Sequence, residues 1–286
     1  MSDPAPRSAE PRAAEPYSDA DLARLGLSRE RLPVHVAAIM DGNGRWAVGK
    51  GRPRHEGHAA GAKAADRIVE ECARLGIEQL TLYCFSRENW KRPATEFEFL
   101  MALLKRYAVE QRPNVERHGL RFETIGRRDG LPADVMAEVD RTIELAKPNR
   151  GMRLCLALDY GSRDEIARAA RKIADDVAAG GLRPEDVTED AFAARLDTAG
   201  WPDPDLVLRT AGEYRVSNFL LWQISYAELA ISEKPWPDFG PEDLHAALRS
   251  FAARDRRFGG LNDPSPVPGE SAPAEDASSP DGAAGA

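Results

Sequence analysis

Short apolar runs of strand type alternate with amphipathic helical patterns through most of this chain. Strands are expected near residues 35–40, 79–86, 121–125, 153–159 and 205–210, and helices near residues 58–75, 95–118, 132–146, 162–179, 189–196 and 241–254. Such alternation is typical of α/β proteins, in which helices cover both faces of a mostly parallel sheet. We therefore expect a single α/β domain with a mostly parallel central sheet flanked by helices.

Length and composition fit one folded domain between two tails. The 286 residues are 42% hydrophobic, which is enough to bury a full core. Residues 1–20 and 262–286 are rich in Pro, Ala and acids and poor in large apolar side chains. Both segments are expected to be disordered, because they bury too little apolar surface to offset the entropy of ordering. The folded domain is then expected over residues 21–261.

The charge of the chain lies mostly in these tails. The formal net charge is 39 − 47 = −8, and removing the tails leaves about −1 for the middle. A chain without a positive field is not expected to bind nucleic acid, and local arginines must attract any anionic substrate. Cys72, Cys84 and Cys155 lack metal-ligand spacing, which indicates reduced thiols in a cytoplasm. No apolar run approaches the roughly 18 residues of a membrane span.

The first strand ends in a loop whose residues suit a phosphate. This loop holds Asp41, Gly42, Asn43, Gly44, Arg45 and Trp46. Ligands of α/β proteins bind beyond the carboxyl ends of the strands. The two glycines let backbone N–H groups approach an anion, Arg45 adds a fork of donors, and Asp41 is best explained as a ligand of a bridging divalent cation. The alternative is an ordinary glycine turn before a capped helix.

Two more strands end in loops of the same kind. The residues singled out there are Ser86, Arg87, Glu88, Asn89, Trp90 and Arg92 in one loop, and Arg209, Arg215, Val216 and Ser217 in the other. Arg54 and His58 follow the first loop. Together these loops predict a site that holds more than one phosphate, although Arg54 and His58 could be solvated surface residues and Trp90 could belong to the core.

These motifs, with residues 225–229, 236–239 and 256–260, resemble cis-prenyltransferases of the undecaprenyl diphosphate synthase type over about residues 32–260. The resemblance implies an enzyme that condenses isopentenyl diphosphate with an allylic diphosphate, such as farnesyl or geranyl diphosphate. Its product is a cis-polyprenyl diphosphate of medium or long chain, for a cell-wall lipid carrier. The resemblance also implies Mg²⁺, an apolar product tunnel and a homodimer, and it allows peripheral membrane contact during product release.

The resemblance assigns roles to the singled-out residues. The loop from Asp41 to Trp46, with Arg54 and His58, is expected to bind the allylic diphosphate, and Arg209, Arg215, Val216 and Ser217 are expected to bind isopentenyl diphosphate. The loop from Ser86 to Arg92 matches the segment that closes over both substrates. Asp41 and Asn89 are the expected catalytic residues, with Asn89 orienting a proton acceptor because a neutral amide is a poor base. Glu228 is expected to help Asp41 bind Mg²⁺, either within the chain or from a partner subunit, unless it is a paired structural acid.

Other kinds of protein are alternatives to this enzyme. A short-chain or branching synthase of the same fold is the nearest alternative. A non-catalytic subunit of a heteromeric prenyltransferase would lack Asp41, and a polyprenyl phosphate carrier would not need Asn89 or Glu228. Trans-type prenyltransferases depend on Asp-Asp-x-x-Asp segments, which this chain lacks. Departures from the family pattern at Asp159, Ser162, Ala211 and Tyr214 concern fine substrate preference.

Cys84 is the residue that we connect with product length. It lies two residues before Ser86, on the same side of the strand as Leu82. We predict that it lines the product tunnel opposite an apolar helix face made by Phe97, Leu100, Met101 and Leu104. A small side chain there favours ten to twelve isoprene units by family resemblance, whereas the alternative is that Cys84 is ordinary core.

Overall fold

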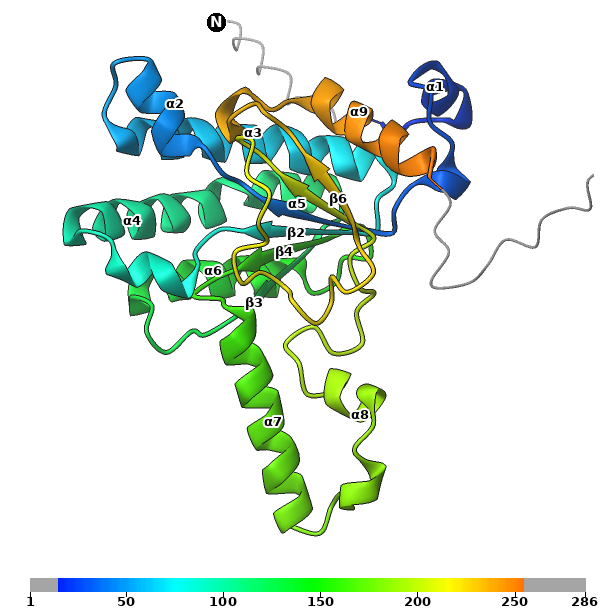
Figure 1. The fold of residues 1–286 in the computed structure, drawn as a ribbon. Coiled ribbons are helices and arrows are strands. Elements are labelled where there is room, and N and C mark those ends of the chain that lie inside the picture. Colours follow the sequence, from blue (N-terminus) through cyan, green and yellow to red (C-terminus); the bar gives the residue numbers. More distant parts are fainter. Residues whose placement is uncertain (1–14, 255–286) are drawn as a thin grey trace, which may run out of the picture. The chain divides into compact units, whose positions relative to one another are not determined.

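Six parallel strands form one sheet in the computed structural model, which describes residues 15–254 (Figure 1). The strands are β1 (His35–Ile39), β2 (Gln79–Tyr83), β3 (Arg121–Ile125), β4 (Arg153–Ala157), β5 (Leu206–Arg209) and β6 (Glu228–Ile231). Their order is β3-β4-β2-β1-β5-β6, and every neighbouring pair is parallel. The expected α/β domain with a parallel central sheet is confirmed.

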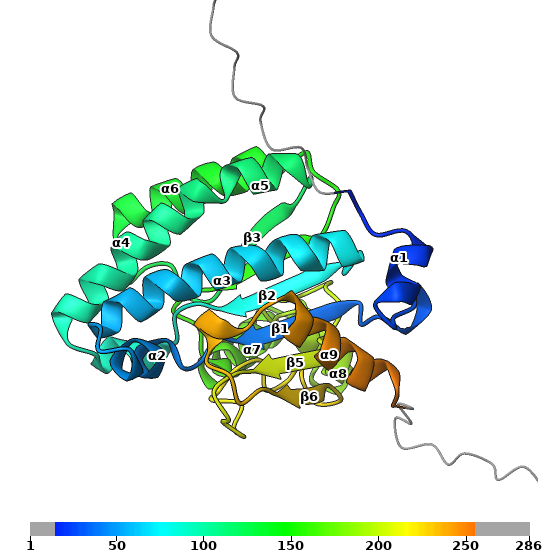
Figure 2. The same ribbon diagram turned by 90° about the horizontal axis from the view of Figure 1, so that it is seen from above.

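Helices lie on both sides of this sheet. They are α1 (Asp19–Arg24), α2 (Asn43–Gly49), α3 (Arg54–Leu75), α4 (Ala94–Glu110), α5 (Arg112–Arg117), α6 (Ala133–Ala146), α7 (Ser162–Ala178), α8 (Glu189–Ala193) and α9 (Pro241–Ala252). Short 3-10 helices are η1 (Arg29–Arg31), η2 (Arg87–Lys91), η3 (Pro184–Asp186) and η4 (Trp236–Asp238). Helices α3 and α9 cover one side, and α7 and α8 lie on the other (Figures 1 and 2).

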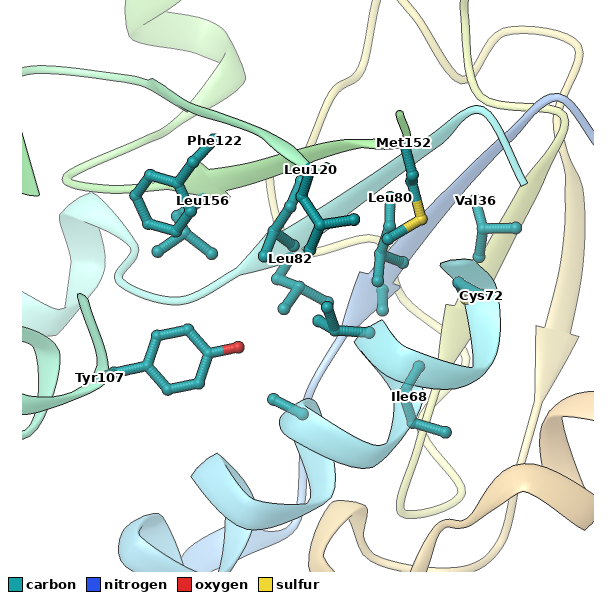
Figure 3. Packing of buried hydrophobic residues seen from close by; sticks show 14 of the residues in the cluster. Val36, Ile68, Cys72, Leu80, Leu82, Tyr107, Leu120, Phe122, Met152 and Leu156 are labelled. Carbon is teal, nitrogen blue, oxygen red and sulfur yellow. The ribbon is translucent and has the colours of Figure 1, made fainter. Parts of the chain in front are cut away.

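Successive residues of the central strands serve two separate cores. Val36 and Ala38 of β1 pack with Leu80 and Leu82 of β2 beneath α3, in the core shown in Figure 3. Ala37, between them, belongs to the core on the opposite face. Because neighbouring side chains of a strand point to opposite faces, a sheet covered on both sides reads as a continuous apolar run. Strand β1 is accordingly buried at all five positions.

The helix expected over residues 95–118 is two helices instead of one. Helices α4 and α5 meet at Gln111, and Pro113 lies in the first turn of α5. Proline has no N–H to continue the ladder of helical hydrogen bonds, so the helix is interrupted just before it. Helix α1 and strand β6 were not expected, because six and four residues carry too little periodicity to be recognised.

The folded domain begins earlier than residue 21. Ser18 caps α1 through a hydrogen bond from the Asp21 N–H, and Arg74 stacks on the ring of Tyr17 at 4.1 Å. Residues 15–20 are therefore ordered, and assigning them to a disordered tail was wrong. Residues 1–14 and the expected tail over 262–286 lie outside the described residues, as do residues 255–261 of the expected domain.

Candidate active site

The carboxyl ends of β1 and β5 bring Asp41 and Arg209 together. Ile39 pairs with Arg209 in the sheet, and Asp41 follows two residues later. Arg209 is 4% exposed, and its Nη2 lies 2.8 Å from Oδ2 of Asp41. The hydroxyl of Thr210 also donates to the backbone carbonyl of Asp41 at 2.7 Å. From β1 the chain continues to β2 on one side, and β5 lies on the other side of β1. In α/β proteins, ligands bind in the crevice at the carboxyl end of a strand placed in this way, and Asp41 and Arg209 lie at that end.

Asp41 is held in its ionised form. Burial alone would raise the pKa of its carboxyl group, but hydrogen bonds from Arg209 and from the Gly42 N–H outweigh that effect. The Gly42 N–H lies 2.6 Å from Oδ1, and Arg45 adds a positive charge 3.4 Å from the same oxygen. The pKa of Asp41 therefore lies below its usual value. A carboxylate in this state can act as a ligand for a cation.

Close packing between α2 and α3 fixes the loop that follows Asp41. A Cβ on Gly57 would lie 1.9 Å from the backbone oxygen of Asn43, and a Cβ on Gly61 would lie 2.3 Å from its Oδ1. Gly42 has φ +94°, where only glycine is unstrained, and a Cβ there would meet Ala211 and Pro235 at 2.8 Å. Gly42 thus allows the loop to approach Ala211 and Pro235, and Gly57 and Gly61 allow α3 to approach Asn43, whereas the expected approach of an anion to the loop stays a prediction.

Arg54 lies against the start of α2. A Cβ on Gly44 would come within 2.7 Å of Nη2 of Arg54, so the guanidinium group covers the position that a side chain would take. Oδ1 of Asn43 is buried and has no hydrogen-bond partner among the described residues. Buried polar atoms are normally paired, so this oxygen is available to a ligand.

The loop that contains η2 follows β2, and its residues line the same pocket as Asp41 at the carboxyl ends of the strands. The Ser86 N–H donates to Oδ1 of Asn89 at 3.0 Å, which leaves the Asn89 amide NH₂ as a donor. Arg92 forms an ion pair with Glu96 at 2.7 Å. Trp90 is 41% exposed and contacts Phe97, so it is neither a fully buried core residue nor a free surface residue.

Asp159 anchors this loop from the end of β4. The carboxylate is 3% exposed and accepts hydrogen bonds from Nε1 of Trp90 at 2.6 Å and from Nη1 of Arg87 at 3.3 Å. Burial raises its pKa, although both of these contacts oppose that shift. Its φ of +43° is uncommon outside glycine, and Asp and Asn tolerate it best. The departure from the family pattern at this position thus has a structural role that its sequence context did not reveal.

Glu213 links two arginines of the site and was not predicted. Its Oε1 lies 3.0 Å from Arg45, and its other oxygen forms an ion pair with Arg215. The side chains of both arginines are more than half exposed. A carboxylate between two exposed arginines occupies the place that an anionic ligand could take. A glutamate in a loop has no sequence feature that would predict these two ion pairs before the fold is known.

A polar pocket of about 550 Å³ brings together eight of the predicted residues, from all three loops. Those that line it are Asp41, Ser86, Glu88, Asn89, Arg92, Arg209, Arg215 and Ser217. Tyr83 and Asn218 also line it and were missed, although each lies close in sequence to a predicted serine. Val216 lies in the same loop, next to Ser217, whose hydroxyl accepts from Arg209 at 2.7 Å. Ser217 and Asn218 both have positive φ, so this loop is held in an uncommon conformation.

An apolar cavity of about 100 Å³ lies beside the polar pocket, and Met40 lines both. Asn43 and His58 line it as well. Nε2 of His58 is buried, lies 3.5 Å from Oε1 of Glu96 and makes no hydrogen bond within the described part of the chain. Burial, together with the nearby charge of Arg92, lowers the pKa of His58, so the imidazole is neutral near pH 7.

The walls of this cavity include most of the residues expected around a product tunnel. Cys84, Leu100, Met101 and Leu104 all line it, whereas Phe97 does not. The thiol of Cys84 is inert, because burial raises its pKa to about 12. Cys84 therefore contributes shape to the cavity and no thiolate chemistry.

Trp46 and Glu228 are among the predicted residues that do not line the polar pocket, and both contact other parts of the chain. Trp46 points to η4, where its Nε1 donates to Asp238 at 2.7 Å. In the sheet, Glu228 of β6 pairs with Leu206 of β5, and Leu206 pairs with Val36 near the start of β1. The carboxylate of Glu228 forms an ion pair with Arg254. By strand rise and spacing it lies roughly 19 Å from Asp41. The two acids of one chain therefore cannot hold the same ion, and the intrachain form of the metal prediction is wrong.

The residues around Asp41 fit Mg²⁺ only together with a substrate. No group of three or more His, Cys, Asp or Glu side chains within residues 15–254 could hold a metal ion by itself. Mg²⁺ is often bound by one or two carboxylates plus substrate phosphates and water. Asp41 is ionised and faces the polar pocket, so it can supply the single protein carboxylate that such a site requires.

These features define an α/β protein in which a polar, arginine-containing pocket adjoins an apolar cavity. A family model described as putative undecaprenyl diphosphate synthase matches residues 39–259, and the chain belongs to this family of prenyltransferases. The isoprenyl transferases of Geobacter sulfurreducens and Rhodopirellula baltica are 51% and 50% identical to it. These matches cover 82% and 84% of this chain and 95% and 99% of the relatives. The protein is a prenyltransferase.

Solved structures of the same kind resemble the fold. Lavandulyl diphosphate synthase from Lavandula x intermedia, in complex with dimethylallyl diphosphate, has a TM-score of 0.79 at 38% identity. That match covers 80% of this chain and 99% of the other. A probable undecaprenyl diphosphate synthase from Campylobacter jejuni has a TM-score of 0.66 at 33% identity, and the match covers 79% and 98% of the two chains.

Proposed function

We propose that this prenyltransferase condenses isopentenyl diphosphate with an allylic diphosphate and releases a cis-polyprenyl diphosphate. The observation that carries the proposal is the ionised Asp41 and buried Arg209 at the head of a polar pocket that shares Met40 with an apolar cavity. A diphosphate fits the first compartment and a hydrocarbon chain the second. Farnesyl and geranyl diphosphate have this chemistry, and a chain product of medium or long length suits a cell-wall lipid carrier.

The reaction joins two carbons and releases one diphosphate. Carbon 4 of isopentenyl diphosphate forms the new bond to carbon 1 of the allylic substrate, whose bond to the diphosphate oxygen breaks. The leaving diphosphate keeps that electron pair. A proton leaves carbon 2 of the isopentenyl unit, and its electrons form the new double bond. The protein must therefore stabilise the departing anion and direct the proton to an acceptor.

The residues of the polar pocket can meet both demands. Arg45 and the backbone of the loop after Asp41 would bind the allylic diphosphate, and Arg215 with Ser217 would bind isopentenyl diphosphate. Asn89 would donate its NH₂ to a diphosphate oxygen, because Oδ1 already accepts from Ser86. An oxygen held in this way is a better proton acceptor than a neutral amide. Mg²⁺ held by Asp41 would neutralise charge on the leaving diphosphate.

We further propose that the enzyme is a cytoplasmic homodimer in which Glu228 serves the metal site of the partner. The distance between Glu228 and Asp41 within one chain supports an action across an interface. Leu229 and Tyr226 are exposed beside Glu228, at the edge strand β6. The cysteines Cys72, Cys84 and Cys155 are free, as in reducing compartments. No helix within residues 15–254 is long and apolar enough to cross a membrane.

A short-chain or branching synthase remains the second candidate. The cavity of about 100 Å³ is small for a long product. The lavandulyl diphosphate synthase among the similar structures shows that the fold is used by an enzyme of that name. Incubation with labelled isopentenyl diphosphate, Mg²⁺ and allylic primers of several lengths distinguishes the candidates by the length of the dephosphorylated products.

Asp41→Ala tests the metal role directly. We expect kcat to fall by roughly 10²–10⁴-fold, because the leaving diphosphate loses its cation. The variant should still fold, but its melting temperature should fall because the buried Arg209 loses its carboxylate partner, and a melting curve measures this. EDTA should abolish the wild-type activity, and added Mg²⁺ should restore it. Wild-type turnover by the Ala variant would refute the assignment.

A further inference from the structure

Glu213 is shared between two arginines from different loops, one after β1 and one after β5. Its Oε1 lies 3.0 Å from Nη2 of Arg45, and its other oxygen forms an ion pair with Arg215. The proposed reaction assigns these two arginines to different substrates. One carboxylate of the protein therefore neutralises a charge in each of the two expected diphosphate positions.

This carboxylate is an anion that solvent can reach. The hydrogen bond and charge of Arg215, with the charge of Arg45, lower the pKa of Glu213, so its side chain is ionised near pH 7. The Glu213 side chain is partly exposed, and both arginines are more than half exposed. Exposed ion pairs contribute little stability, because water screens them and two long side chains must be held in place. A ligand with more negative charge can therefore displace Glu213.

The neighbouring ion pair between Arg209 and Asp41 is of a different kind. Arg209 is buried, and its guanidinium group donates to Asp41 and to the hydroxyl of Ser217. It also donates to the backbone carbonyl of Arg215. Since Arg209 holds both loops in place, displacement of Glu213 needs only the rotation of side chains.

The exchange is the same whichever substrate binds first. A diphosphate at Arg45 takes the place of one carboxylate oxygen and repels the other. When Glu213 turns away, the guanidinium group of Arg215 becomes available to a second diphosphate. A diphosphate that binds first at Arg215 releases Arg45 in the same way.

We propose that Glu213 couples the two diphosphate positions: it occupies both arginines in the free enzyme, and the first diphosphate to bind displaces it and prepares the second position. This inference rests on the proposed condensation reaction. The first ligand bears the cost of breaking both ion pairs, so the second binds more tightly than it would alone. Because coupling between two sites is reciprocal, each substrate must strengthen the binding of the other by the same factor.

Binding constants of isopentenyl diphosphate test this coupling. Equilibrium dialysis of the labelled compound with Mg²⁺ gives its Kd with and without saturating farnesyl thiodiphosphate, whose carbon–sulfur bond resists cleavage. In the wild-type protein, the analogue should lower this Kd at least about fivefold, a typical size for coupling between sites. In Glu213→Gln, the Kd without the analogue should already be low, and the analogue should change it by no more than about twofold. Glu213→Ala should behave in the same way, because neither variant carries the competing charge.

Glu138→Gln is the matched control, because Glu138 on α6 also pairs with two arginines, Arg112 and Arg141, at 2.6 Å each, and does not line the polar pocket. It should keep both wild-type Kd values, and melting curves check that each variant is folded. Weaker binding by Glu213→Gln, or an unchanged Kd in the absence of the analogue, would overturn the proposal, as would a wild-type Kd that the analogue does not lower. A wild-type protein that binds no isopentenyl diphosphate in either condition would refute the proposed function itself.

Discussion

Single residues at the ends of β1, β2 and β5 determine what the polar pocket can bind. Their identity was predictable because short polar loops after apolar strands mark the ligand side of an α/β sheet. Asp41, Asn89 and Arg209 were found in this way, and the structure brings all three to one pocket. The contacts of Glu213 with Arg45 and of Asp159 with Trp90 were not predicted, because each joins segments that are distant in sequence.

Arg215 and Arg45 should serve different substrates. Arg215→Ala should raise the KM for isopentenyl diphosphate by roughly 10–100-fold, because a lost charge-assisted contact costs about 1.5–3 kcal/mol. Arg45→Ala should act mainly on the KM for the allylic primer. Steady-state kinetics with each substrate varied in turn gives both values. Arg209 is unsuited to this test, since it also holds Asp41.

Arg183→Ala is the control for this pair of variants, because Arg183 is an exposed arginine whose ion pairs within residues 15–254 are with Glu185 and Asp186 of its own connector. Both KM values should stay at the wild-type level in this variant. If Arg215→Ala and Arg45→Ala each changed both KM values equally, the two-site assignment would be wrong.

Helix contacts carry information that the hydrophobic pattern alone does not contain. The pattern predicted α3, α6 and α7 well, because each is long and amphipathic. It did not predict the break at Gln111, where the apolar positions continue through the interruption. Nor did it show that Gly57 and Gly61 allow α2 to pack against α3, since a helical glycine has several possible reasons.

Asp66 should make the α3–α4 contact sensitive to pH. Burial raises its pKa from 3.8 to about 6, and the charge of Glu110 adds to this shift. The native state therefore binds the proton more tightly than the unfolded chain, and stability falls as pH rises from about 4 to about 6. Asp66→Asn should flatten this dependence and raise the melting temperature at pH 7.5, because the variant has no buried charge at this position. Its neutral amide can still accept the hydrogen bond that the side-chain amide of Gln111 donates to Asp66.

Melting curves from pH 4 to pH 7.5 provide the measurement. Asp175→Asn is the control, since Asp175 is an exposed acid on α7 that should leave the profile unchanged. Asp66 would be shown to titrate normally if the Asn variant and the wild-type protein had the same profile.

At the scale of the whole molecule, the open question is how Glu228 could contribute to the metal site at Asp41. The sequence placed Asp41 and Glu228 in one metal site by resemblance, but strand order separates them across β5 and β6. Sequence spacing could not reveal this separation, because β6 was not recognised and its register with β5 fixes the distance. A role for Glu228 in catalysis therefore requires a second copy of the chain.

Mixed dimers test this requirement. Asp41→Ala and Glu228→Gln should each be nearly inactive alone, and the second should fold normally because an exposed ion pair with Arg254 contributes about 0–1 kcal/mol. When the two variants are co-expressed, half of the dimers should be mixed, and each mixed dimer should hold one complete site. The preparation should then recover about a quarter of the wild-type activity.

Light scattering must show a dimer in each case. If Glu228 acted within its own chain, no mixed dimer would contain a complete site and activity would not return. A monomeric enzyme, or full activity of Glu228→Gln alone, would remove Glu228 from the catalytic site and leave it as the partner of Arg254.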